Sequence, residues 1–418
     1  MTVCFRNQNC RLCGSAKVAL GANFVPTPPG DVFASYDKLG QKEEAFPLDI
    51  FLCQNCGLIQ ILDVVDPAVL YGNYIYRTQA SLGLSEYFRK YAEEVLAFVR
   101  PHAGSLVIDI GCNDGTLLRY FIEKGLKVLG VDPAPIAQQI ASSGIEVLQH
   151  FFSADIGKEI RSGYGTPSLV TANNVVANID DLKNLFTGIR ELIGQEGCFV
   201  FETGYGLDLV DKKLLDVVHH EHLSYFTVGS LQKSLGLFGL ELIHVQHSVS
   251  KGGCIRCYIQ GKNGRRKVQP SVSQMIDLES HKGIEKISSF GPFNAFIHET
   301  RERLQREISA LHARGEAIVG YGASVGTTTL EYLFGLSDKI LYVVDDNLDR
   351  FGLYTPGHHI PVHPSQILYD RRPQLVVVFA WRYIEPILKR HQAFIREGGK
   401  FLTFLPAWKI YGDSEKIL

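Results

Sequence analysis

Neither sign of charge dominates the sequence, and no long apolar run interrupts it. The 418 residues include 42 lysines and arginines against 44 aspartates and glutamates, a net charge of −2. That balance excludes a broad basic surface for nucleic acid or anionic lipid. No stretch of about twenty apolar residues could span a bilayer, and the first ten residues, MTVCFRNQNC, lack the apolar core of a signal peptide. We therefore expect a cytoplasmic protein without a nucleic-acid or membrane partner.

Disulfides are not expected either, because nine cysteines is an odd number and the expected compartment is reducing. Four cysteines form two CxxC pairs, and two such turns complete a tetrahedral sulfur cage for zinc: Cys10, Cys13, Cys53 and Cys56. Four protein ligands leave no open position, so this zinc would be structural. A redox CxxC or coincidental core cysteines are the alternatives. The other five are expected to be buried, inert thiols: Cys4, Cys112, Cys198, Cys254 and Cys257.

A strand that runs into a glycine turn lies in the middle of the chain. The apolar strand is followed by D-x-G-x-N-D-G and a helical pattern, and the motif residues are Asp109, Gly111, Asn113, Asp114 and Gly115. In a doubly wound sheet this turn lies at the carboxyl edge, where ligands bind, and the glycines let the backbone approach a ligand closely. The next strand ends in Asp132, whose carboxylate can accept hydrogen bonds from ribose hydroxyls.

The residues of this turn favour S-adenosylmethionine (SAM) over NAD. NAD would require G-x-G-x-x-G beneath its pyrophosphate, whereas Asp109 and Asp114 suit the cationic groups of SAM. Asn173, at the end of a later strand, is expected at the amino-acid end of the cofactor. The alternative is a Rossmann-like turn that holds no cofactor.

A histidine cluster follows in the segment 216–226, DVVHHEHLSYF. The metal motif HExxH fails here, because Ser224 stands where the second histidine should be. A neutral imidazole can take a proton from a carbon that a neighbouring carbonyl has acidified, so the segment predicts acid–base chemistry beside the methyl group of SAM. Partly buried polar side chains without catalytic work are the alternative.

Several long motifs occur together in an order typical of one known family. They are CRLCG and CQNCGLIQ, YIYRTQAS, VIDIGCNDG, HEHLSYF, KGGCIRCYI, VGYGAS, VVDDN, YTPGHHIPV and FAWRY. With these motifs the chain resembles the three-domain SAM-dependent sugar C-methyltransferases of deoxysugar biosynthesis, which act on nucleotide-linked 4-keto-6-deoxy sugars. The resemblance covers nearly the whole chain and implies SAM, zinc and a nucleotide-sugar, with dTDP as the expected nucleotide.

The resemblance also implies roles for individual residues. Tyr76, Glu221 and His222 match active-site positions of the family, and His222 would remove the C3 proton so that the enolate attacks the methyl group of SAM. Two catalytic positions depart from the family pattern: His219 replaces a tyrosine and Asn178 replaces a histidine. We therefore expect C3-methylation and keep three alternatives open. These are methyl transfer to oxygen or nitrogen, another SAM-supported reaction, and a non-catalytic module that binds SAM or a sugar nucleotide.

A second strand–glycine turn–helix pattern lies near the C-terminus. Its spacing, G-x-G-x-x-x-G, is one residue longer than the NAD fingerprint, so a second cofactor is not expected. The resemblance implies that this part binds the nucleotide-sugar. Backbone N–H groups of the turn formed by Gly322, Ala323 and Ser324 are expected to meet a phosphate at the helix N-terminus. Arg382 would pair with a phosphate or, with Trp381, stack on a base; strand-end packing is the alternative.

The motif sets together predict an α/β protein with three parts. Hydrophobic residues make up 45% of the chain, which is ample for packed cores and excludes disorder as the main state. The expected parts are a zinc-binding subdomain (1–68), a Rossmann-like SAM methyltransferase domain (69–264) and a second Rossmann-like α/β domain that binds the nucleotide-sugar (265–418). The assembly is expected to be a monomer or a homodimer.

Overall fold

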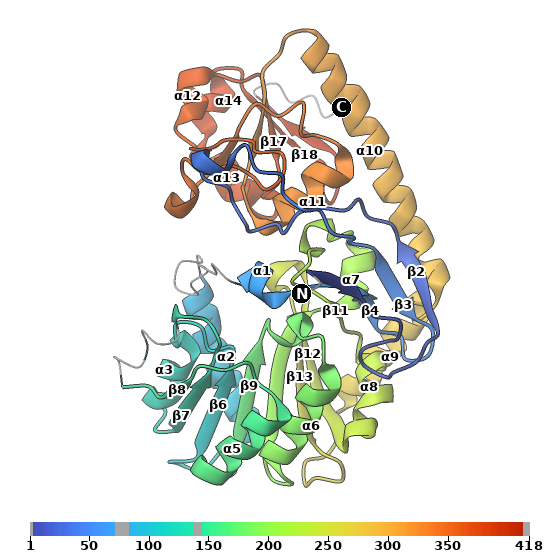
Figure 1. Ribbon diagram of the computed structural model, residues 1–418, viewed down its shortest axis with the longest axis vertical. Coiled ribbons are helices and arrows are strands. Elements are labelled where there is room, and N and C mark those ends of the chain that lie inside the picture. The colour runs from blue at the N-terminus through green and yellow to red at the C-terminus, as the bar shows by residue number, and fades with distance from the viewer. Residues whose placement is uncertain (1–2, 72–82, 137–139, 141–143, 413–418) are drawn as a thin grey trace.

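The computed structural model describes residues 3–71, 83–136, 140 and 144–412. Figure 1 shows a lower body built on one sheet, an upper body built on another, and N-terminal strands beside the junction of the two. No helix in the described part of the chain is long and apolar enough to cross a membrane.

The N-terminal strands form small antiparallel sheets. Their bounds are β1 (Cys4–Arg6), β2 (Val18–Ala22), β3 (Ile50–Cys53), β4 (Ile59–Ile61) and β5 (Asp63–Val65), with helix α1 (Pro67–Tyr71) after them. β1 pairs with β5. β2, β3 and β4 form a second sheet, which is completed by β11 (Ser224–Tyr225) from the histidine segment. In that pairing Ser224 lies opposite Gln60, and Tyr225 lies opposite Ile59. A strand more than 160 residues further along the chain is thus part of the zinc-binding sheet.

The central sheet has the strand order β12-β13-β10-β9-β6-β7-β8 among the described residues. Its strands are β6 (Leu106–Ile110), β7 (Lys127–Val131), β8 (Val147–Leu148), β9 (Leu169–Asn173), β10 (Cys198–Gly204), β12 (Leu240–Ser248) and β13 (Cys254–Gly261). The first five in chain order are parallel, and β13 runs antiparallel to β10. Because β6 lies between β7 and β9, the order reverses there, and ligands of doubly wound sheets bind at the carboxyl ends of the strands at such a point.

Helices cover both faces of the central sheet, and its parallel strands β6, β7, β9 and β10 are therefore mostly apolar and buried. Their bounds are α2 (Leu84–Val99), α3 (Thr116–Glu123), α5 (Ala154–Tyr164), α6 (Leu182–Ile193), α7 (Gly206–Asp211) and α8 (Val228–Ser234). Val107 packs in a cluster with residues of α2, whereas its neighbour Ile108 packs in the larger cluster with residues of α6. This alternation along β6 follows from the period of two in a strand.

The C-terminal sheet has the order β16-β15-β14-β17-β18-β19, which is the Rossmann order 3-2-1-4-5-6 with an antiparallel last strand. Its strands are β14 (Ile318–Tyr321), β15 (Val343–Asp345), β16 (Val362–Pro364), β17 (Leu375–Val378), β18 (Lys400–Thr403) and β19 (Lys409–Tyr411). The helices of this part are α11 (Val325–Phe334), α12 (Ile367–Arg371), α13 (Ile384–Arg390) and α14 (Gln392–Arg396). Helix α9 (Pro270–Lys282) packs instead against β12 and α8 of the central part, and α10 (Phe290–Ala313) runs from there to α11 and β14 (Figure 1). The predicted fold class, with two Rossmann-like sheets and an N-terminal zinc-binding part, is confirmed.

A long connection between β2 and β3, residues 23–49, reaches the C-terminal sheet (Figure 1). Asp31 forms an ion pair with Arg350 at 3.2 Å, and Ala34 forms a β-bridge with Tyr354. The N-terminal part therefore contacts the central part through β11 and the C-terminal part through this connection. The domain boundaries at residues 68 and 264 stay predictions.

Candidate functional site

The four paired cysteines converge on one point. The Sγ atoms of Cys10 and Cys56 are 3.7 Å apart, those of Cys13 and Cys53 are 3.6 Å apart, and all four lie within 4.8 Å of one another. Zinc–sulfur bonds of about 2.3 Å in a tetrahedron place the sulfurs about 3.8 Å apart, so the cluster has the size of a zinc cage. Four thiolates would fill the coordination shell and give zinc a structural role.

Each pair closes through a tight turn ending in a glycine. Gly14 donates its N–H to the carbonyl of Cys10 with φ +72°, and Gly57 does the same to Cys53 with φ +87°. Both φ values lie in the left-handed region, which glycine adopts without strain. The glycine that follows each CxxC is therefore required by the turn that aims the thiols at the metal.

Metal analysis of the purified protein should find about one zinc per chain. Cys53→Ser should lose that zinc, because the three remaining thiols cannot complete the cage. Cys4→Ser, outside the two pairs, is the matched control and should retain the metal. Equal zinc content in the Cys53 variant and the control would remove this assignment.

The glycine turn after β6 forms as the sequence predicts. Gly111 and Gly115 have φ +73° and +72°. A Cβ at Gly111 would lie 2.2 Å from Cγ2 of Val175, and one at Gly115 would lie 2.9 Å from Cγ2 of Ile140. The chain's own side chains therefore occupy the space beside both glycines, so packing of the turn requires them, in addition to any approach by a ligand.

Two carboxylates organise this turn from adjacent strands. Both oxygens of Asp132 accept backbone N–H groups, from Asn113 and from Ala134, each at 2.8 Å. Asp109 lies within β6 and accepts a hydrogen bond of 2.6 Å from the Thr171 hydroxyl. The pKa of Asp109 is raised to about 7, mainly by burial and in smaller part by the charge of the nearby Asp132. Burial also raises the pKa of Asp132. A bound cation would favour the ionised form of both.

Asn173 ends β9 beside this turn. Both polar atoms of its side-chain amide are buried, and neither has a hydrogen-bond partner among the described residues. An unpaired buried amide costs about 1–3 kcal/mol, and a ligand at the carboxyl edge of the sheet would satisfy it. This orphaned amide and the carboxylates fit the amino-acid end of SAM.

The histidine segment lies at the same edge of the central sheet. Tyr205 follows β10 and forms a parallel bridge with Phe226, and 3-10 helix η3 (Val176–Asn178) packs beside β11. The segment that contains His219, His220, Glu221 and His222 therefore passes over the carboxyl ends of β9 and β10.

His222 has a defined tautomer. Its Nδ1 lies 2.9 Å from the carbonyl oxygen of Val217, which can only accept, so Nδ1 carries the proton and Nε2 carries the lone pair. Burial lowers the pKa of His222 to about 4, even though the Val217 carbonyl opposes that shift. At neutral pH the side chain is thus an uncharged imidazole with an available base at Nε2.

The flanking histidines and Glu221 differ from His222. The ring of His219 lies against that of His222 at a tilt of 39°, with the ring centroids 3.9 Å apart. Burial lowers the pKa of His219 well below the ordinary value, which disfavours imidazolium. His220 directs Nε2 to the Phe46 carbonyl at 3.2 Å, and its pKa falls to about 4 through burial. Burial raises the pKa of Glu221 to about 7, and the charge of Asp31 adds to the rise.

Three known domains match consecutive parts of the chain. Residues 10–71 match the family described as "Putative zinc binding domain", residues 84–245 match a methyltransferase domain, and residues 249–406 match the C-methyltransferase C-terminal domain. The zinc-sized cysteine cluster lies in the first of these matches.

The chain is a SAM-dependent methyltransferase with these three domains.

Known proteins are similar to this methyltransferase over different lengths. C-methyltransferase NovU from Streptomyces niveus is 28% identical over 400 residues, which cover 95% of each chain. The solved structure of magnesium protoporphyrin IX methyltransferase from Synechocystis PCC 6803 with bound SAM is 14% identical and covers 46% of this chain and 86% of that chain, with a TM-score of 0.32. A SAM-dependent methyltransferase from Clostridium acetobutylicum ATCC 824 is 12% identical and covers 47% and 96%, with a TM-score of 0.33.

The backbone N–H groups of the glycine turn before α11 form hydrogen bonds within the protein, which the sequence did not predict. Gly322 donates its N–H to Val344, Ala323 to the Asp345 carboxylate at 2.6 Å, and Ser324 to the Thr327 hydroxyl at 3.0 Å. In this turn, which the structure describes in full, each of the three N–H groups already has an acceptor. A phosphate would have to compete with these acceptors, so the phosphate-binding role of the turn stays a prediction.

Arg382 joins the C-terminal domain to the histidine segment. Its guanidinium forms two contacts with Asp216, at 2.6 and 3.2 Å. Thr329 of α11 donates a hydrogen bond of 2.7 Å to the Val218 carbonyl in the same segment. A phosphate at Arg382 would have to compete with Asp216, so a nucleotide role for Arg382 stays a prediction. Tyr76 lies outside the described residues.

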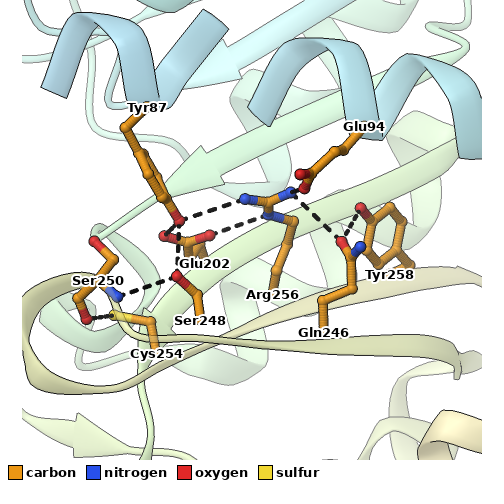
Figure 2. Close-up of polar contacts among 9 residues, drawn as sticks. All are labelled: Tyr87, Glu94, Glu202, Gln246, Ser248, Ser250, Cys254, Arg256 and Tyr258. Carbon is orange, nitrogen blue, oxygen red and sulfur yellow. Dashed lines mark hydrogen bonds and ion pairs between the residues drawn. The ribbon is translucent and has the colours of Figure 1, made fainter. Parts of the chain in front are cut away.

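A buried ion network was not predicted from the sequence (Figure 2). Arg256 of β13 contacts Glu202 of β10 at 3.0 Å and Glu94 of α2 at 2.7 Å, and Tyr87 donates a hydrogen bond to Glu202. The Arg256 guanidinium also lies 4.0 Å from the ring centre of Tyr91. Glu202 lies beside Asn173 in the sheet, so the network supports the strand end that carries this unpaired amide. An arginine inside an otherwise apolar strand was the only sequence signal.

Proposed function

We propose that this methyltransferase transfers the methyl group of SAM to C3 of a nucleotide-linked, dTDP-type 4-keto-6-deoxy sugar. The observation that carries the proposal is His222, a half-buried neutral imidazole whose lone pair is fixed on Nε2. The likeness of the whole chain to a C-methyltransferase supports a carbon acceptor. A carbon next to a ketone needs a base of this kind, whereas a hydroxyl or amine acceptor has less need of one.

The proposed reaction begins with proton removal. The C3–H bond breaks, its proton goes to Nε2 of His222, and the electron pair forms a C3–C4 double bond with negative charge on the ketone oxygen. SAM supplies the electrophilic methyl group, and S-adenosylhomocysteine is the leaving product. The Glu221 carboxylate would stabilise the His222 imidazolium after proton transfer, and the neutral His219 would offer an N–H to the substrate oxygen.

The test is product analysis after incubation with SAM and a dTDP-4-keto-6-deoxy sugar. We expect S-adenosylhomocysteine together with a sugar whose added methyl group is bonded to carbon and survives hydrolysis of the nucleotide-sugar. The second candidate, methyl transfer to oxygen or nitrogen, is favoured by His219 and Asn178 at the two departing positions. A methyl group on a heteroatom would establish it. Ligand binding without turnover across a panel of keto sugars would indicate a binding module.

The pH dependence of kcat/KM should follow the ionisation of Glu221 and not that of His222. His222 is already neutral above about pH 4, whereas Glu221, with its pKa raised to about 7, loses its negative charge as the pH falls through 7. If the carboxylate is needed, kcat/KM should fall about tenfold per pH unit below that point. Glu221→Gln should have a lower kcat/KM and no such acid limb. A profile that stays flat from pH 8 to pH 5 in the unmodified enzyme would contradict this role.

A further inference from the structure

We propose that Lys251 is a catalytic residue whose ammonium group binds the ketone oxygen of the substrate as negative charge develops there. The inference rests on the proposed function and assigns a role to the KGGC motif. The loop formed by residues 249–253 joins β12 to β13 and includes a 3-10 helix, η6 (Ser250–Gly252). Lys251 is the charged residue of that motif, and the reaction described above gives it no role.

The loop is built around a left-handed lysine. Lys251 has φ +50° and ψ +27°, a conformation that costs free energy in any residue with a Cβ. The next residues, Gly252 and Gly253, supply the freedom that the loop needs. A Cβ at Gly253 would lie 1.9 Å from a carboxylate oxygen of Asp208, so the backbone is pressed against that side chain. Glycine would adopt this backbone conformation at a lower free-energy cost, so the presence of lysine indicates a function for its side chain.

Backbone contacts fix the position of this loop. Gly253 donates its N–H to Ser250 and accepts a hydrogen bond from the N–H of Tyr205. Lys212 donates a hydrogen bond of 3.3 Å to the Gly252 carbonyl. On its other side, a Cβ at Gly252 would lie 3.2 Å from Nη1 of Arg382, the residue that pairs with the histidine segment. The loop therefore borders the histidine segment through a rigid set of contacts.

The charge of Lys251 acts on the proposed catalytic groups. Burial is the largest influence on all three pKa values: it lowers those of His219 and His222 and raises that of Glu221. The ammonium of Lys251 lowers all three, so it adds to the effect of burial at the histidines and opposes it at Glu221. Lys251 itself is exposed and forms no hydrogen bond or ion pair with any residue in the described ranges. Its loop leads into β13 opposite the end of β10, where Gly204 pairs with Cys254, so this cation lies at the edge of the sheet over which the histidine segment passes.

The proposed proton transfer needs such a cation. His222, with its pKa near 4, is a weak base, so the ketone oxygen must be stabilised strongly for the C3 proton to leave. His219 is neutral and can offer only one N–H, in place of the family's tyrosine. In the step, the C3–H electron pair moves into the C3–C4 bond and the carbonyl π pair moves to the oxygen, where the Lys251 ammonium donates a hydrogen bond. The proton goes to Nε2 of His222.

The deciding variant is Lys251→Met, which removes the charge and keeps the length of the side chain. We expect kcat with SAM and the keto sugar to fall about 10²–10³-fold, as when one oxyanion donor is removed. The Kd of dTDP, measured by calorimetry, should change less than threefold, since the ammonium acts at the sugar ketone. Lys251→Arg should recover at least tenfold of the lost kcat.

Two further variants separate catalysis from loop structure. Lys213→Met is the matched control, because Lys213 also has a left-handed φ, +54°, and its ammonium donates to the carbonyl of Asp211. It should keep kcat within threefold. Lys251→Gly suits the left-handed backbone, so its unfolding midpoint should be equal or higher while kcat falls as in the methionine variant.

Each other outcome overturns the inference. A kcat of Lys251→Met within threefold of the unmodified enzyme would exclude a catalytic role. A large rise in the Kd of dTDP with unchanged kcat would place the ammonium at the diphosphate instead. An equal loss in Lys213→Met would indicate a general effect of charge or folding. No turnover of the keto sugar by the unmodified enzyme would instead overturn the proposed function, and this inference with it.

Discussion

His222→Asn is expected to lower kcat by about 10²–10⁴-fold while the Kd of SAM changes little. The substitution removes Nε2, the proposed base, and such bases contribute this range of rate enhancement. The asparagine amide can still donate a hydrogen bond toward the Val217 carbonyl that Nδ1 of His222 contacts at 2.9 Å. The variant therefore removes basicity and preserves the contact that holds the segment. Single-turnover methyl transfer and calorimetric titration with SAM are the two measurements.

His220→Asn is the matched control for that experiment. His220 is buried and neutral, but its Nε2 faces the Phe46 carbonyl. Its replacement should reduce thermal stability and leave kcat within several-fold. If both asparagine variants lose turnover equally, the loss reflects damage to the segment, and His222 is not the base.

Arg256→Met should reduce the free energy of unfolding by about 3–5 kcal/mol, because it leaves a buried carboxylate without its countercharge. The Glu202 side chain is only 2% exposed and faces Arg256 at 3.0 Å. Methionine fills much of the arginine volume, so the expected loss arises from charge and not from a cavity. For a domain of this size the unfolding midpoint should fall on the order of 10 °C, measured by differential scanning fluorimetry.

The cause of that loss can be isolated within the same network. Glu94, the other partner of Arg256, has a side chain that is 53% exposed, so Glu94→Gln should cost less than about 1 kcal/mol. Adding Glu202→Gln to Arg256→Met should recover stability, since the uncompensated charge is then gone. A double variant no more stable than Arg256→Met would show that lost packing on the Tyr91 ring dominates.

The parts predicted correctly from the sequence depend on residues close together in the chain. The CxxC pairs, the glycine turn after β6 and the second Rossmann-like sheet each follow from a pattern within about thirty residues. The zinc cluster and the fold class are confirmed. The catalytic, SAM-contacting and sugar-contacting roles of individual residues stay predictions.

The parts that were missed depend on distant partners. β11 pairs with β4 across more than 160 residues, and Arg256 meets Glu94 across 162. No local periodicity marks either contact. The phosphate role of the turn 322–324 stays a prediction, but the acceptors of its N–H groups were missed for a related reason. A glycine turn before a helix predicts free N–H groups, but the capping box and Asp345, 22 residues from Ala323, take them.

The β11–β4 pairing restricts how hybrid enzymes can be assembled from relatives of this methyltransferase. An exchange of residues 1–68 alone would replace Ile59 and Gln60 while retaining Tyr225 and Ser224 opposite them. The same exchange would separate Asp31 from the Arg350 with which it pairs. If the crossover points are placed at the ends of contiguous domains, β4 and β11 would therefore come from different parents and would pair imperfectly at the histidine segment. Functional chimeras should need the N-terminal strands, residues 223–226 and the loop around Arg350 to come from the same parent.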